Sequence, residues 1–440
     1  MLRSTGSHGT EECGSLPLVD VGGSGIAHRR QRNLIEVDGF SGQAQLEEVR
    51  RWCASGLLSL TGHHDELVAP PRGMVARLDA LALSLETAAA RRGAALEVSW
   101  EELVLGRAAL RSFGRQGRRS VNGSCQLLAT SDDRWIAINL ARDDDRQLLD
   151  ALLEAPSGDD AALARWVGAH TAHHVVERGR LLGLPIATLS APTIVDPVLR
   201  VPLSARAPRD ADGPLVVVDL SSMWAGPLCA SLLGRTGAEI INVESTTRPD
   251  GARADGAFYA WLHHDEHLVS IDFDTREGVT ELRELLESAD VVIESTRPRA
   301  LAQLGLDPFA LELKEAMVWL SITGHGRSDA GDAVAFGDDA AVAGGLVGFD
   351  RGGDPVFCGD AIADPITGML GAAVVLASLD QGGGELLDLS MARAASSMVD
   401  PFLWGTAPRF VATDTTESEA IIIDGAILDV SRPAKPVVAA

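Results

Sequence analysis

The feature that most constrains the fold is a regular alternation of strand and helix patterns between residues 214 and 323. Short apolar runs, each followed by a helical stretch, recur along this segment. Such alternation is typical of a parallel sheet with helices on both faces, that is, of an α/β domain. The predicted strands are Leu215–Leu220, Glu239–Glu244, Leu268–Phe273, Asp290–Ser295 and Met317–Thr323, and the helices include Pro227–Arg235 and Thr275–Ser288.

In an open parallel sheet, ligands bind beyond the carboxyl ends of the strands. No GxGxxG pattern follows the first strand, which argues against a dinucleotide site. The segment Thr323–Gly326 is predicted either to present backbone N–H groups to a ligand or to form a plain turn. The strand ends are Ser221–Ala225, Glu244–Ser245, Ser295–Arg297 and Thr323–Gly326.

The residues before this segment predict a smaller α+β domain. Apolar residues at helical spacing mark three helices, a hairpin follows, and two further helical stretches lead into a buried strand. These elements are expected at Leu46–Ala54, Leu78–Ala90 and Trp100–Arg111, with a short strand at Leu96–Ser99, then at Gly123–Leu140, Asp144–Glu154, Asp159–Leu182 and Leu181–Leu189.

A chain of 440 residues is longer than one ordinary core and predicts several domains. Residues 191–213 are rich in proline and lack periodicity, which is typical of a connection. The predicted organisation is a poorly ordered start (1–45), a small-domain-like half with a degenerate repeat (46–200), a linker (201–213), a large domain (214–404) and a low-complexity tail with one apolar strand (405–440).

The charge and cysteine content exclude several functions. The net charge of −24, from 38 basic and 62 acidic residues, argues against nucleic acid and anionic membranes as partners. The five cysteines have no metal-ligand spacing, and the N-terminus has no signal pattern, so a reducing, cytoplasmic location is expected. The apolar helix Met369–Leu379 is shorter than a bilayer span and is expected in a core.

Two segments of the chain resemble each other at an offset of 291 residues, with a slip of two residues at their start. Leu85 then aligns with Leu376, and Gly93 with Gly384. The match predicts an internal duplication, although two amphipathic helices can agree by chance. In this alignment Asp364 stands opposite Gly73, so only the second copy has the carboxylate.

Asp364 is the leading candidate for chemistry. Aspartate before proline at a helix start is commonly a simple cap, because it accepts backbone N–H bonds. The same position, beside a glycine-rich strand end, also suits a carboxylate nucleophile. Both interpretations stay open on local sequence alone.

Other polar groups have plainer interpretations. Three groups rich in histidine favour a solvated polar face over a metal site, and no metal is predicted; they are His63–Glu66, His170–Glu177 and His263–His267. The arginines of Gly114–Ser120 suit phosphate, but a solvated loop is the simpler expectation. No base is apparent for Cys229 or Cys358, which argues against a reactive thiol.

Six ordered stretches of the second half resemble class III CoA-transferases, the CaiB/BaiF family. Residues 50–200 resemble the other half of that family, so the chain resembles a permuted or partly duplicated member. The stretches are LVVVDLSSMWAGPLCASLLGRTGAEIINVES, DFDTREG, ADVVIESTRPRALAQLGLD, LSITGHGRSDAG, GDAIADPITGMLGAAVVLASL and GELLDLSMARA.

The resemblance implies a Rossmann-like large domain, a smaller α+β domain and a homodimer of two interlocked chains. It implies that Asp364 is a catalytic nucleophile that moves CoA between an acyl-CoA and a carboxylic acid through an aspartyl intermediate. CoA is then a substrate, and no bound cofactor is expected. The residues that match the CoA-lining segments of the family are Trp224, Ala225, Ser295, Thr296, Arg297, Thr323, Gly324, His325 and Gly326.

Several positions depart from the family pattern and keep a second function open. His263–His267 replaces a basic segment, Asn242 stands where a lysine is common, and Gln303 stands where an arginine can meet the nucleotide. These changes favour the alternative of a non-catalytic partner subunit or binding module. Phe336-Gly337 replaces the His-Asp pair of related racemases, which argues against racemisation, and a lyase is a further alternative.

Overall fold

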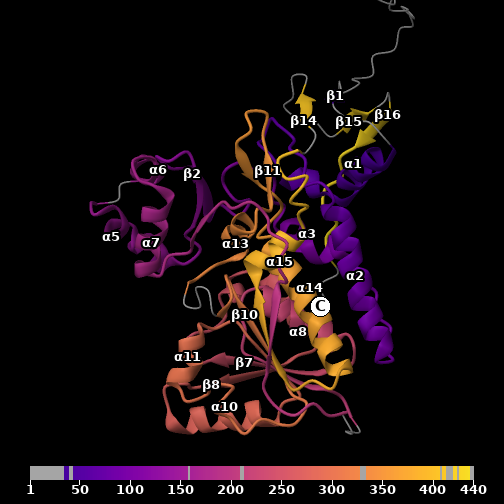
Figure 1. The fold of residues 1–440 in the computed structure, drawn as a ribbon, viewed down its shortest axis with the longest axis vertical. Coiled ribbons are helices and arrows are strands. Elements are labelled where there is room, and N and C mark those ends of the chain that lie inside the picture. Colours follow the sequence, from indigo (N-terminus) through magenta and orange to yellow (C-terminus); the bar gives the residue numbers. More distant parts are fainter. Residues whose placement is uncertain are drawn as a thin grey trace, which may run out of the picture. The chain divides into compact units, whose positions relative to one another are not determined.

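The computed structural model describes residues 34–38, 43–156, 159–208, 213–327, 333–406, 409–412, 420–423 and 426–436. All of these residues belong to one compact unit, Asn33–Ala440. Its centre is a seven-stranded sheet in the lower half of Figure 1.

Six strands of this sheet are parallel, and β5 joins its edge antiparallel to β13. The order β5-β13-β10-β9-β6-β7-β8 is the doubly wound arrangement. From β6 the chain adds β7 and β8 on one side, and it then returns to add β9, β10 and β13 on the other side. The strands predicted between residues 215 and 323 are all present. The bounds are β6 Val216–Asp219, β7 Glu239–Ser245, β8 His267–Ile271, β9 Val291–Glu294, β10 Val318–Thr323, β13 Glu385–Ser390 and β5 Val198–Pro202.

Helices cover both faces of the sheet, as the alternation predicts. Neighbouring strand residues point to opposite faces: Val217 packs in the core formed with α8 and α14, whereas Val218 packs in the core formed with α10. The fold class is therefore α/β. The bounds are α8 Ala225–Gly234, α9 Gly256–Leu262, α10 Arg276–Ser288, α11 Pro298–Gln303, α13 Gly337–Ala343, α14 Ala363–Asp380 and α15 Met391–Ser397, with the 3-10 turn η2 at Gly251–Ala254.

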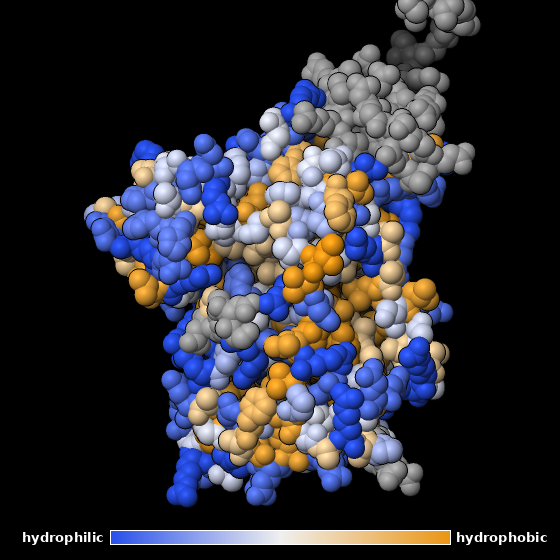
Figure 2. Space-filling model, viewed as in Figure 1, coloured by the Kyte–Doolittle hydropathy of each residue, from blue (hydrophilic) through white to orange (hydrophobic). Residues whose placement is uncertain are grey.

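The central helix α14 is longer than the sequence predicts. It has 18 residues, and among the described residues it is the one helix long and apolar enough to cross a bilayer. Length therefore does not exclude a span, contrary to expectation. Two thirds of it (67%) is buried, as in the core helix of a globular protein. Figure 2 shows apolar surface gathered over the region where Figure 1 places α14 and α15.

The helices of the first half pack against α14, mainly through α2 and also through α3. The predicted strand at Leu96–Ser99 is wrong. None of the described strands pairs with it, and the backbone N–H of Val98 instead donates to the Glu86 carboxylate at 2.9 Å. The bounds are α1 Gln43–Ser55, η1 Leu57–Leu60, α2 Met74–Arg91 and α3 Trp100–Arg111.

A small α+β lobe follows α3 and has its own core. Its antiparallel sheet, in the order β2-β3-β4, contains the predicted hairpin, and its helices pack on that sheet through residues such as Leu152 and Val175. The helical stretch predicted at Asp159–Leu182 is divided into two helices. The bounds are β2 Cys125–Ala129, β3 Trp135–Asn139, β4 Ile186–Thr188, α4 Asp143–Gln147, α5 Leu149–Leu153, α6 Asp160–Gly168 and α7 Ala172–Leu182.

Two regions contain more strands than the sequence predicts. β5 lies within residues 191–213, where it completes the edge of the main sheet although its prolines hid the pattern. The tail, where one strand was expected, contributes three strands to a second sheet that also includes β1 from the N-terminal region. The bounds are β1 Leu34–Asp38, β14 Arg409–Ala412, β15 Ala420–Ile423 and β16 Ala426–Asp429, and a hairpin of β11 Val347–Phe349 and β12 Pro355–Phe357 precedes α14.

Candidate active site

A cavity of about 200 Å³ lies at the carboxyl ends of β6, β9 and β10, beside the point where the sheet order reverses. This is the position where doubly wound sheets bind their ligands. The cavity is lined by Arg142, Ser222, Met223, Ala225, Ser295, Thr296, Arg297, Ile322, Thr323, Gly324, Ala333, Val334, Ala335, Phe336, Asp364 and Met391.

Buried polar side chains fix the strand ends that form this cavity. At the end of β6, Asp219 accepts the backbone N–H of Ser221 at 2.8 Å. After β9, Glu294 accepts both the N–H and the hydroxyl of Thr296 at 2.8 Å. After β10, the Thr323 hydroxyl accepts the N–H of Gly326 at 2.8 Å. The loops around the cavity therefore have defined positions before any ligand binds.

Asp364 faces this cavity from the first turn of α14. The helix begins at Ala363, and its N-cap is Ile362 without a side-chain cap. The interpretation of Asp364 as a simple cap is therefore wrong, because the helix starts before this residue rather than after it. Its carboxylate is directed to the cavity instead of to the backbone of its own helix.

The surroundings of Asp364 are unusually acidic. Burial raises the pKa of Asp364 to about 8, Arg107 opposes this rise, and Asp338, Asp339 and Asp360 add to it. Burial likewise raises the pKa values of Asp338 and Asp339 to about 7. A carboxyl group that changes protonation near neutral pH is typical of functional sites.

One buried cation balances this cluster. Arg107, on α3 in the first half of the chain, donates from Nε to Oδ2 of Asp360 at 2.8 Å and from Nη2 to Oδ1 at 2.5 Å. Its side chain is 13% exposed, and that of Asp360 is 1% exposed. The guanidinium also lies 4.7 Å from the centre of the Trp224 ring.

The structure brings seven of the ten predicted site residues to the cavity. Trp224 is 1% exposed and packs under Arg107, and neither it nor His325 and Gly326 belongs to the cavity lining. Arg142 and Phe336 were missed. The sequence signal for Arg142 was weak, because it stands directly before the acidic residues that open α4.

Comparison with known proteins finds a match for the part of the chain that supplies most of this cavity. The family model described as CoA-transferase family III matches residues 213–421, which include β6, β9, β10 and Asp364. Residues 213–421 are therefore similar to CoA-transferase family III.

Several curated proteins that this chain resembles are CoA-transferases. Succinate–glutarate CoA-transferase of Agrobacterium fabrum is 29% identical over 207 residues, which is 42% of this chain and 51% of that protein. The beta subunit of succinyl-CoA–L-malate CoA-transferase of Chloroflexus aurantiacus is 31% identical over 40% of this chain and 47% of its own. Human succinyl-CoA:glutarate CoA-transferase is 30% identical over 40% of this chain and 44% of its own length. The chain spans about half the length of these relatives.

A solved CaiB/BaiF family protein from Brucella suis aligns with this chain at a TM-score of 0.39 and 26% identity, covering 42% of this chain and 54% of that protein.

The segment His263–His267, where family III commonly has basic residues, is partly buried rather than solvated. The side chains of His263 and Glu266 are each 1% exposed, and Nδ1 of His263 lies 2.7 Å from Glu266. Burial alone would lower the pKa of His263, but Asp250 and Glu266 raise it to about 9. The expectation of a solvated face is therefore wrong for His263.

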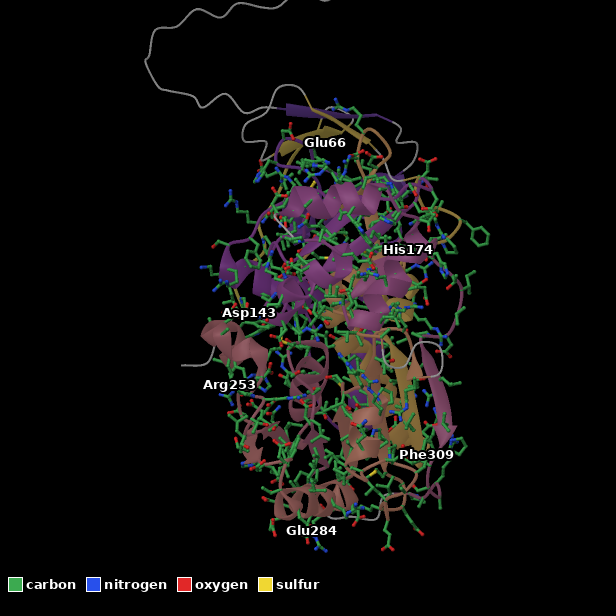
Figure 3. All side chains as sticks on the ribbon, turned by 90° about the vertical axis from the view of Figure 1, so that its left-hand side faces the viewer. Glu66, Asp143, His174, Arg253, Glu284 and Phe309 are labelled. Carbon is green, nitrogen blue, oxygen red and sulfur yellow. The ribbon has the colours of Figure 1, made fainter. Side chains whose placement is uncertain are left out.

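The histidines of α7 and the cysteines Cys229 and Cys358 lie outside the cavity lining. His173, His174 and Glu177 are exposed on α7, as expected of a solvated face, and Figure 3 labels His174. Within the described ranges, no three His, Cys, Asp or Glu side chains are grouped so as to hold a metal ion. Burial raises the pKa of the Cys229 thiol well above its usual value and that of Cys358 to about 12, as inert core thiols show.

The arginine-rich loop Gly114–Ser120 is partly exposed, and its arginines have protein partners. Arg115 donates to the carbonyl oxygens of His63 at 2.9 Å and His64 at 3.2 Å. Arg118 pairs with Asp354 at 2.5 Å, and Arg119 pairs with Asp160. Each guanidinium thus joins segments far apart in the sequence.

Proposed function

We propose that this protein is a CoA-transferase that moves CoA between an acyl-CoA thioester and a carboxylic acid, with Asp364 as its nucleophile. The observation that carries the proposal is the Asp364 carboxylate at the cavity beyond β6, β9 and β10. The family III match over that part of the chain and the curated relatives support it. The transfer requires a nucleophile and a site for a thioester, and this arrangement offers both.

The proposed reaction proceeds through covalent steps at one carboxylate. The Asp364 carboxylate attacks the thioester carbonyl, a mixed anhydride forms, and CoA leaves as its thiolate. The thiolate then attacks the aspartyl carbonyl, which gives an aspartyl-CoA thioester and releases the donor acid. The acceptor carboxylate attacks this thioester and expels the thiolate again, and attack of the thiolate on the acceptor carbonyl yields the new acyl-CoA and free Asp364.

The cavity is large enough for the reacting end of an acyl-CoA but not for the whole molecule. Sites for drug-sized ligands are typically about 300–1,000 Å³, whereas this cavity measures about 200 Å³. It suits the thioester and acyl group, with the nucleotide end of CoA outside it. Arg142 and Arg297 both line the cavity, and their charge favours an acyl group that carries a second carboxylate.

We therefore propose dicarboxylic acids as donor and acceptor. The named substrates of the relatives, which include succinate, glutarate and malate, support this choice. The guanidinium of Arg142 is held by Asp145, with Nε donating to Oδ1 at 2.9 Å, so its position is fixed before substrate binds.

The decisive experiment replaces the nucleophile. Purified protein is incubated with succinyl-CoA and either glutarate or malate, and product thioesters are separated by chromatography. Asp364→Asn should abolish transfer, whereas Asp159→Asn should not, because Asp159 is a carboxylate N-cap on α6 in the small lobe. Hydroxylamine added during turnover should leave a hydroxamate on the Asp364 peptide. Unchanged transfer by Asp364→Asn would contradict the assignment.

A non-catalytic partner subunit is the second candidate. It is favoured by the buried His263, which stands in place of a basic segment and is held by Glu266 rather than directed toward a ligand. Titration calorimetry with CoA and acetyl-CoA separates the two candidates, because only the transferase requires binding. Racemisation is disfavoured, because Gly337 lies directly against Asp364 and leaves no space for a second base there.

We also propose the homodimer that the family resemblance implies. Size-exclusion chromatography with light scattering tests it, and a monomer at micromolar concentration would contradict it.

A further inference from the structure

The duplication predicted from the sequence has a structural counterpart in the helices α2 and α14. Both have 18 residues: α2 spans 74–91 and α14 spans 363–380, a constant offset of 289. The residues that end them, Arg92 and Gln381, share the same backbone angles, φ −95° and ψ 7°. The glycines that follow, Gly93 and Gly382, both have positive φ. The two helices therefore have the same length and the same backbone conformation at their C-terminal ends.

This register corrects the sequence alignment around the nucleophile. With the helices superposed by their ends, Asp364 corresponds to Val75 rather than to Gly73. Val75 is 2% exposed and belongs to the core that α2 shares with α14. The first copy thus lacks a nucleophile and packs on the helix that has one.

The first copy instead contributes a cation. α3 follows α2 as α15 follows α14, and each starts after a serine N-cap, Ser99 and Ser390. Arg107 of α3 crosses to the second copy and forms the two-point ion pair with Asp360. Trp224 at the start of α8 and Phe258 of α9 stack beneath the guanidinium, at 4.7 and 5.5 Å from the ring centres.

Asp360 belongs to the turn that leads into the nucleophile. The turn contains Gly359 with φ +73° and Ala361 with φ +40°, a conformation that is costly for alanine. Ala361 is held on both sides: its N–H donates to Asp338 at 3.0 Å, and its carbonyl accepts the N–H of Asp364 at 2.9 Å. The position of Asp360 therefore determines where α14 begins and where Asp364 lies.

We propose that Arg107 is a positioning residue that the first copy of the repeat supplies to the second: it fixes the 359–361 turn through Asp360 and favours the ionised form of the Asp364 carboxylate. This inference rests on the proposed function, in which that carboxylate is the nucleophile. Arg107 would act through Asp360 and through its charge, without contact with the substrate.

The charged groups around Asp364 make the effect of Arg107 measurable. Arg107 faces it from α3, Asp338 and Asp339 from α13, and Asp360 from the turn. Arg142 and Arg297 line the same cavity. Loss of the Arg107 charge removes the cation that most opposes protonation of Asp364, so a higher pH would be needed to ionise it.

The test uses four variants: Arg107→Gln, Arg107→Lys, Asp360→Asn and the double variant Arg107→Gln/Asp360→Asn. The double variant guards against misfolding, because it leaves no unpaired buried charge. The first readout needs no substrate. Each variant is also made with Asp364→Asn added. Urea denaturation from pH 5 to 9.5 gives the unfolding free energy with Asp364→Asn minus the unfolding free energy without it.

That difference should increase with pH and become constant where Asp364 is fully ionised. We expect the pH at which the difference becomes constant to rise by about one unit in Arg107→Gln and to fall in Asp360→Asn. This pH should be close to that of the unmodified protein in both the double variant and Arg107→Lys. A purely structural ion pair predicts equal losses of stability from both single variants and no change in this pH, which would overturn the proposal.

The second readout is the ascending limb of kcat/KM for acyl transfer against pH. In each variant, the pH of this limb should shift in the same direction as the pH at which the free-energy difference becomes constant. Arg107→Lys should leave the pH of the limb unchanged but lower kcat at least tenfold, because one ammonium cannot replace the two-point contact. An unchanged kcat in Arg107→Lys would overturn the positioning role. If the pH at which the free-energy difference becomes constant shifts but no background transfers CoA, the transferase function fails while the link between Arg107 and Asp364 stands.

Discussion

The backbone of Gly337 lies directly against the carboxylate of Asp364. A Cβ at position 337 would stand 2.6 Å from Oδ2 of Asp364 and 2.2 Å from the carbonyl oxygen of Ala361. Both distances are far below ordinary contact, so only glycine permits the first residue of α13 to approach the turn and the proposed nucleophile together. The absence of a side chain at this position shapes the site as much as the residues that line it.

Gly337→Ala should therefore damage activity and stability at once. The new methyl group must displace the Asp364 carboxylate or the 359–361 turn, at a cost of about 1–3 kcal/mol for overpacking. We expect CoA transfer to fall at least tenfold and the urea midpoint to decrease. Gly256→Ala is the matched control, because Gly256 also begins a seven-residue helix and a Cβ there meets nothing within 4 Å. Equal behaviour of the two variants would contradict the steric argument.

Asp339→Asn should stabilise the protein at neutral and higher pH. Burial raises the pKa of Asp339 from 3.8 to about 7, so between these values the folded state binds more protons than the unfolded state, and stability falls as pH rises. Asparagine does not titrate, and it retains the acceptor for Asn139 and Phe336. The variant should match the unmodified protein near pH 4 and gain up to ~1.4 kcal/mol per pH unit above that. Urea denaturation at pH 4 to 8 measures this, and a constant difference would contradict it.

The main sheet and the nucleophile were accessible from sequence for a clear physical reason. Buried parallel strands require continuous apolar runs, and the helices between them require a different period, so both elements are visible locally. Asp364 was identifiable because it stands in a contiguous stretch, GDAIADPITG, that resembles a known family. Its cap interpretation failed because a helix start is difficult to place within two residues.

The electrostatic part of the site depends on contacts across long sequence separations. Arg107 and Asp360 are 253 residues apart, and no local pattern connects them. His263 was expected in solvent because its neighbours are polar, yet it is enclosed by Glu266, three residues on, and by Asp250, thirteen residues earlier. β5 escaped prediction because a strand at a sheet edge tolerates proline and shows little apolar alternation.

Buried thiols should resist alkylation in the folded protein. The thiolate is the reactive form, and with a pKa of about 12 the Cys358 thiol is ionised to roughly one part in ten thousand at pH 8. Cys53, Cys125 and Cys229 are buried as well. We expect peptide mass spectrometry to find these four residues unlabelled by iodoacetamide at pH 8 in native buffer and labelled in urea. Rapid native labelling of Cys229 or Cys358 would point to a reactive thiol beside the cavity.

His263 should stabilise the fold only while it carries its proton. Its pKa is raised from 6.5 to about 9, so the stabilisation is fully present below pH 6.5 and is lost as pH rises through 9. His263→Gln should therefore cost most at pH 6, by about 1–3 kcal/mol more than at pH 9.5. His267→Gln is the matched control, because its side chain is 71% exposed. Urea denaturation at the two pH values decides the question: a loss independent of pH would show that His263 acts through packing against Tyr259 and not through its charge.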